Sequence, residues 1–155
     1  MQFSSKEDIE APIDAVFREI TDFQSFERSA LRRGAEVQRT DNLAAPAVGM
    51  NWHARFMLRG RKREMDIDLV DYDPPNGIGL EARATAVLGR MRVDLVALSR
   101  GRTRLSVDLA LEPRSISGRL MVQSLKLARA NLSKRFRLRV ADYAVDIEER
   151  FKRNA

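Results

Sequence analysis

The most constraining feature of the sequence is a change in the spacing of its apolar residues near Pro113. Between residues 35 and 113 apolar side chains recur at every second position and are interrupted by Gly, Pro and Asn, which is typical of antiparallel strands joined by tight turns. Beyond Pro113 the spacing becomes three and four residues, as in an amphipathic helix. The apolar helical positions are Met121, Leu125, Ala128, Leu132, Phe136, Val140, Tyr143, Ile147 and Phe151. This order predicts an antiparallel sheet whose apolar face is covered by one long C-terminal helix.

The remaining elements follow from local signals. Residues 2–10 are predicted to form a first strand, and Pro12 suits the first turn of a short helix. Asp22 can cap a second short helix that stops at Gly34. Strands are predicted at residues 35–40, 50–59, 63–72, 78–87, 91–99 and 103–112, with turns at Gly60, residues 74–77, Gly89 and residues 100–101.

Length and composition limit the classes of function. A chain of 155 residues with 44% hydrophobic residues is long enough for one stable core, so we expect a single domain over residues 1–155. The absence of cysteine excludes thiolate chemistry and thiolate metal sites, and one histidine, His53, excludes centres that need several. No metal or cofactor is expected. With no apolar run of membrane-spanning length, the expected location is the cytoplasm.

The N-terminal residues resemble a known superfamily. The segment SSKEDIEAPIDAVFREITDFQSFER, residues 4–28, is similar to the first strand, the I-x-A-P-x-x-x-V-F turn and the D-F start of the second helix of START-like proteins. This superfamily includes the birch-pollen allergen and the polyketide cyclase/dehydrase and lipid-transport proteins. The resemblance implies an α+β helix-grip fold, in which about seven antiparallel strands curve around the C-terminal helix and enclose a hydrophobic cavity.

Alternation along the strands predicts which side chains face that cavity. The inward positions are apolar, and three of them, Ala82, Ala84 and Ala86, are small enough to leave space for either a close-packed helix or a ligand. The expected ligand-binding residues are Trp52, Phe56, Met65, Ile67, Leu80, Ala82, Met91, Leu95, Val107 and Leu125. Such a lining would suit a hydrophobic small molecule or lipid.

The outward positions carry paired charges of opposite sign, together with His53. Carboxylates on a solvated face lack the burial that retunes a catalytic pKa, so no catalytic residue is assigned. An enzyme resembling polyketide cyclases remains the alternative, and its only faint polar candidates are Ser124 and Asn131.

Positive charge is predicted to gather at one end of the domain. The net charge is +6, and arginines flank the turns that an up-and-down sheet brings together. These basic residues are Arg32, Arg33, Arg59, Arg61, Arg63, Arg90, Arg114 and Arg119. In START-like proteins this end forms the cavity opening, which implies a basic rim that favours anionic ligands or membranes. An RNA- or ribosome-binding module is the rival interpretation, and either a monomer or a homodimer is compatible with the sequence.

Overall fold

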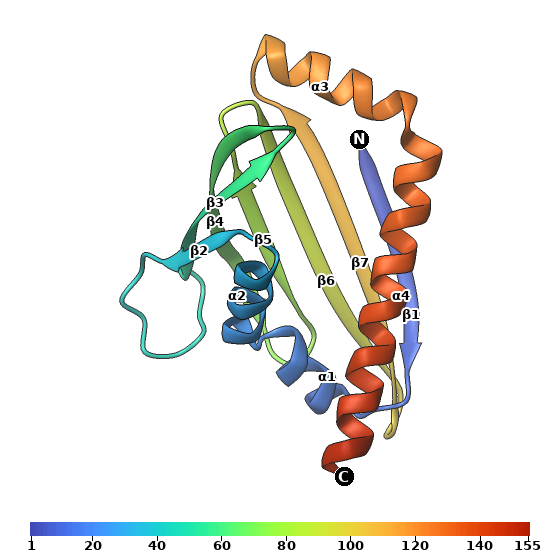
Figure 1. Cartoon of the computed structure of the whole chain (residues 1–155). Coiled ribbons are helices and arrows are strands. Elements are labelled where there is room, and N and C mark those ends of the chain that lie inside the picture. The colour runs from blue at the N-terminus through green and yellow to red at the C-terminus, as the bar shows by residue number, and fades with distance from the viewer.

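The computed structural model describes residues 1–155 and contains seven strands and four helices (Figure 1). The strands are β1 (Gln2–Ile9), β2 (Glu36–Arg39), β3 (Asn51–Leu58), β4 (Arg61–Asp73), β5 (Gly77–Arg83), β6 (Val87–Ser99) and β7 (Arg102–Pro113). The helices are α1 (Ile13–Ile20), α2 (Phe23–Arg32), α3 (Ile116–Leu127) and α4 (Arg129–Asn154). The predicted α+β helix-grip architecture is confirmed.

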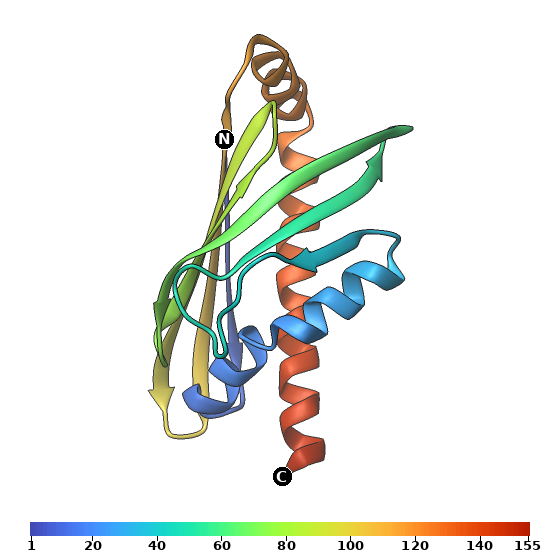
Figure 2. The same ribbon diagram turned by 90° about the vertical axis from the view of Figure 1, so that its left-hand side faces the viewer.

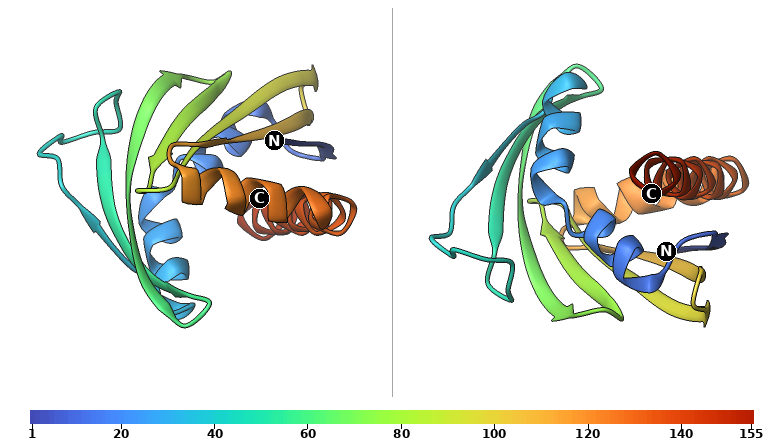
Figure 3. Two further views of the ribbon diagram at one scale, coloured as in Figure 1. Left: turned by 90° about the horizontal axis from the view of Figure 1, so that it is seen from above. Right: turned by 90° about the horizontal axis from the view of Figure 1, so that it is seen from below.

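All seven strands form one antiparallel sheet in the order β1-β7-β6-β5-β4-β3-β2. The first and last strands are neighbours, with Phe3 opposite Leu109 and Ile9 opposite Thr103. The sheet curves strongly, so that β2, β3 and β4 turn toward the same side as the helices (Figures 2 and 3). This curvature gives the sheet a concave face on which α1, α2 and α4 lie, while α3 crosses the upper end of the molecule (Figure 1).

The helices α4 and α2 cover the concave face only along its two edges, at β1 and at β2. Along α4 the buried residues Val140, Ala144 and Ile147 pack on the side of β1 and β7, while α2 lies beside β2 (Figures 1 and 3). The short helix α1 closes the lower end of the space, where Val16 and Ile20 join the packed core. The middle of the concave face, between α2 and α4, is left without a helix over it.

Two local predictions are wrong. The C-terminal helical segment is not one helix, because α3 ends at Leu127 and α4 begins at Arg129 after a bend at Ala128. The apolar spacing continues across this bend, so periodicity alone gives no sign of it. Gly89 is not in a turn but lies inside the sheet, opposite Ala82. The chain reverses at residues 84–86 instead, so Ala84 and Ala86 do not belong to a central strand.

Candidate ligand-binding groove

An apolar groove of about 690 Å³ lies on the concave face between α2 and α4. Strands β2 to β7 form its floor, α2 forms one wall, and α4 forms the other with Phe136, Val140 and Tyr143. Nineteen of its twenty-one lining residues are hydrophobic. A volume of this size accommodates a small organic molecule, and the lining offers few groups with which water can form hydrogen bonds.

Seven of the ten expected ligand-binding residues line this groove: Trp52, Phe56, Met65, Ile67, Leu80, Met91 and Val107. The other three lie elsewhere. Leu95 is buried in the core with Ile9 and Leu105 and is not part of the groove lining. Ala82 is on the inner row of β5 beyond Leu80, and Leu125 belongs to α3, which bends away at the upper end. Contact between the seven residues and a ligand stays a prediction.

The helical wall of the groove was not predicted from the sequence. Phe23, Phe26 and Ala30 of α2 face it, at a spacing of three and four residues. Phe23 packs against Trp52 with ring centroids 5.2 Å apart, and Phe26 packs against Tyr143 of α4 at 5.9 Å. The helical spacing was visible in the sequence, but the partner of α2 was not. The aromatic pair between Phe26 and Tyr143 bridges the two walls of the groove.

One polar contact is built into the apolar wall. The indole Nε1 of Trp52 donates a hydrogen bond of 2.8 Å to Oε1 of Glu27. Trp52 is buried, so its N–H group needs an acceptor inside the protein, and the carboxylate of α2 supplies one. The contact ties α2 to the sheet and holds the Glu27 carboxylate at the groove.

The second polar residue of the lining is Arg139, at the rim. Its guanidinium makes no ion pair or hydrogen bond with the protein, and it borders both the groove and a neighbouring polar hollow that contains Arg33, Asp142 and Asp146. Burial raises the pKa of the adjacent Tyr143 hydroxyl above its usual range, so this group stays neutral and donates to the carbonyl of Glu19. Arg139 is the one cation among the residues that line the groove, and no acidic side chain of the protein forms an ion pair with it.

The eight arginines of the predicted basic rim do not line the groove. Most of them are at the upper end of the molecule, on the β3–β4 hairpin and around the start of α3. Arg33 lies in the polar hollow, and Arg90 is paired with Glu81 and Glu112 on the outer face of the sheet. Ser124 and Asn131 are exposed and also outside the groove.

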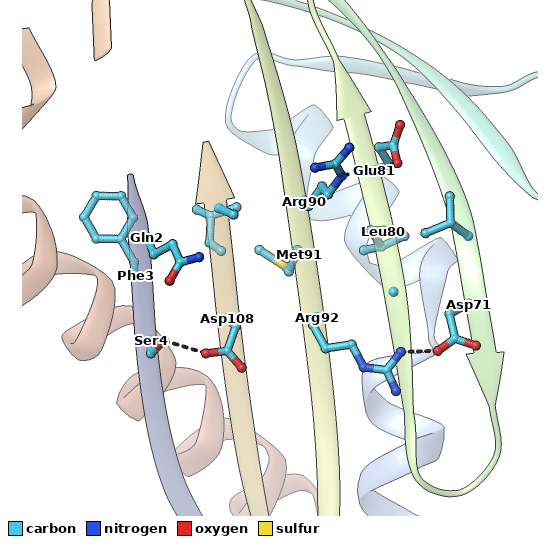
Figure 4. A pocket seen from close by; sticks show the side chains of 14 residues that line it. Gln2, Phe3, Ser4, Asp71, Leu80, Glu81, Arg90, Met91, Arg92 and Asp108 are labelled. Atoms are coloured by element: carbon cyan, nitrogen blue, oxygen red, sulfur yellow. Dashed lines mark hydrogen bonds and ion pairs between the residues drawn. The ribbon is translucent and has the colours of Figure 1, made fainter. Parts of the chain in front are cut away.

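The outer face of the sheet contains a smaller hollow, of about 410 Å³, whose polar groups bond to one another (Figure 4). Arg92 contacts Asp71, and Ser4 donates a hydrogen bond to Asp108. His53 lies on the same face and bonds through Nδ1 to Asp66 at 2.8 Å. No group of three or more His, Asp or Glu side chains is arranged to hold a metal ion. The apolar groove is therefore the stronger candidate site.

Comparison with known proteins supports the same fold. The family described as polyketide cyclase/dehydrase and lipid transport matches residues 1–143. The chain belongs to this family. No curated protein matches the chain. Membership of the polyketide cyclase/dehydrase and lipid transport family is consistent with a groove between the sheet and the C-terminal helix.

Several solved structures resemble this member of the family. The Zhui aromatase/cyclase from Streptomyces sp. R1128 is 14% identical, with 97% of this chain and 95% of that chain covered and a TM-score of 0.68. A START superfamily protein from Mycobacterium smegmatis is 16% identical, with 86% and 95% covered and a TM-score of 0.54. Ara h 8.0201 is 9% identical, with 89% and 97% covered and a TM-score of 0.57. At these identities the likeness shows the fold alone.

Proposed function

We propose that the protein is a cytoplasmic carrier that binds a hydrophobic small molecule or lipid in the groove between α2 and α4. The observation that carries the proposal is the groove itself, which has a volume of about 690 Å³ and is lined almost wholly by apolar residues. Packed interiors do not keep voids of this size without an occupant or an opening. An apolar ligand would be stabilised there by its removal from water.

A ligand with an acidic head fits the polar residues of the groove best. The unpaired guanidinium of Arg139 lies where the groove meets solvent, so it can bind a carboxylate or phosphate while the apolar tail fills the groove. The Glu27 carboxylate is already engaged by Trp52. A fatty acid has both an apolar tail for the groove and a carboxylate for Arg139. A cyclase mechanism would instead need polar groups in the groove that are free to act on a substrate.

The first experiment is native mass spectrometry of the purified protein, followed by extraction and identification of any released molecule. A ligand of defined mass is expected. A second assay titrates the protein with a dansyl-labelled long-chain fatty acid. Ala30→Trp places an indole in the groove and should abolish binding, while Ala130→Trp, on the exposed side of α4, should leave binding unchanged. Protein that is always empty, or equal binding by both variants, contradicts the proposal.

The role of Arg139 is tested separately by comparing a fatty acid with the corresponding fatty alcohol. Arg139→Gln should weaken acid binding by about tenfold and alcohol binding much less, because only the acid forms a charge-assisted bond. Arg137→Gln, on an exposed neighbouring position outside the groove, is the matched control. Equal losses for acid and alcohol would leave the apolar groove in place and remove the acidic-head requirement.

A further inference from the structure

Helix α3 presents a row of large aliphatic side chains to solvent. Ile116, Leu120 and Leu127 are 79%, 61% and 92% exposed and share one face of the helix at spacings of four and seven residues. The opposite face is fixed, because Gly118 is packed so tightly on the carbonyl of Ala86 that a Cβ atom there would collide with it. The exposed row therefore keeps its outward orientation.

The chain around this row carries positive charge and no negative charge. Residues 113–141 contain eight Arg or Lys and no Asp or Glu. Residues 42–63 contain five Arg or Lys and again no Asp or Glu. All 22 acidic residues lie outside these two segments. Among the thirteen cations only Arg55 is in an ion pair, with Glu64. These two segments thus carry a charge of +13, whereas the rest of the chain, with fifteen Arg or Lys and 22 Asp or Glu, carries −7.

The fold brings part of each segment to one end of the molecule, namely the tip of the β3–β4 hairpin and helix α3, while residues 129–141 continue down α4 toward the groove. The tip of the β3–β4 hairpin and helix α3 both lie at the upper end in Figures 1 and 2. At the hairpin tip Met57 is 64% exposed and Leu58 is 47% exposed. Leu58 also continues the inward row of Ala54 and Phe56, which line the groove. An apolar track on β3 therefore leads from the groove to this end.

We propose that this end docks onto an anionic lipid bilayer, with α3 lying in the interface and the β3–β4 hairpin tip, which stands apart from α3 at the same end (Figures 2 and 3), reaching the headgroups. The docking surface consists of Ile116, Leu120, Leu127, Met57 and Leu58, together with the cations of the hairpin tip (Arg59, Arg61, Lys62 and Arg63) and those at the start of α3 and within it (Arg114, Arg119 and Lys126). Cations attract the surface to acidic headgroups, and the aliphatic row enters the boundary between headgroups and acyl chains. A surface for RNA would use aromatic side chains for stacking, and none is in this row.

The docking surface extends the proposed function without depending on it, because vesicle binding can be measured whether or not the groove is filled. When the protein is docked, the apolar track on β3 would lead from the bilayer to the groove, so that a lipid could pass between them. The groove variant Ala30→Trp should therefore still bind vesicles, and a docking variant should still bind the dansyl-labelled fatty acid. The two proposals fail independently.

The test is co-sedimentation of the full chain with phosphatidylcholine vesicles, with and without phosphatidylglycerol, at low and high salt. We expect binding only to the anionic vesicles, and a loss at high salt. The triple variant Ile116→Gln, Leu120→Gln, Leu127→Gln should bind at least about tenfold more weakly although its charge is unchanged. Arg59→Ser, Arg61→Ser, Arg63→Ser should lose the low-salt binding.

The matched control replaces three exposed aliphatic side chains outside the docking surface with glutamine: Val48, Val96 and Leu98. This control variant should bind vesicles like the parent protein. No binding of the parent protein to anionic vesicles would overturn the inference, and so would equal binding by the α3 variant. Salt-sensitive binding to an RNA oligonucleotide, unaffected by the α3 substitutions, would identify a nucleic-acid surface instead.

Discussion

The hydrogen bond between Trp52 and Glu27 is the contact through which the wall of the groove can be tested quantitatively. Trp52→Phe removes the indole donor and leaves the carboxylate without it. A part-buried hydrogen bond to a charged group contributes about 1–2 kcal/mol, and the smaller ring forfeits about 1 kcal/mol of apolar burial. We therefore expect the free energy of unfolding to fall by about 2–3 kcal/mol.

Urea denaturation followed by far-ultraviolet circular dichroism measures this effect without the tryptophan signal. With a slope of about 2 kcal/mol per molar, the midpoint should fall by about 1–1.5 M. Glu27→Ala should cost about 1–2 kcal/mol, because it leaves the buried indole N–H without an acceptor. Glu27→Gln should lower the free energy of unfolding by less, since its amide oxygen can still accept the hydrogen bond from the Trp52 indole.

The double variant separates the hydrogen bond from the packing. In the cycle formed by Trp52→Phe, Glu27→Ala and their combination, the coupling energy should be about 1 kcal/mol. A coupling energy near zero, or an equal cost for Glu27→Gln and Glu27→Ala, would refute the reasoning. The contact would then be incidental to the position of α2.

Two further predictions concern α3 and the β2–β3 connection. Gly118→Ala should lower the free energy of unfolding by about 1–3 kcal/mol, because the methyl group meets the rigid carbonyl of Ala86, whereas Gly101→Ala in open space should change it little in the same urea assay. A hydrogen bond from Arg39 holds the pKa of Asp41 below its usual value, so this pair stabilises the fold above about pH 4 and loses its effect as the pH falls through the lowered pKa. The stability difference between the parent protein and Asp41→Asn should therefore shrink in melts taken from about pH 5 down to pH 2, and a constant difference would contradict this assignment.

The floor of the groove was predictable to a useful extent because strand alternation is a local property. Once β3 is recognised, Trp52 and Phe56 must share a face of the strand. If one of them faces the concave side of the sheet, so does the other. The wall was less predictable, because Phe23 and Tyr143 meet the groove only through the way that α2 and α4 lie on the sheet. Arg139 had no sequence signal that distinguished it from Arg137, although only Arg139 lines the groove.

The sequence by itself determined the succession of elements, the apolar and charged faces of the strands, and the segregation of charge along the chain. These follow from periodicity and composition, which depend on residues close together in the sequence. Tertiary structure decided the pairing of β1 with β7, the bend at Ala128 and the uncovered middle of the concave face. Each depends on contacts between distant residues, whose geometry is set by the curvature of the sheet and by the packing of α2 and α4 at its two ends.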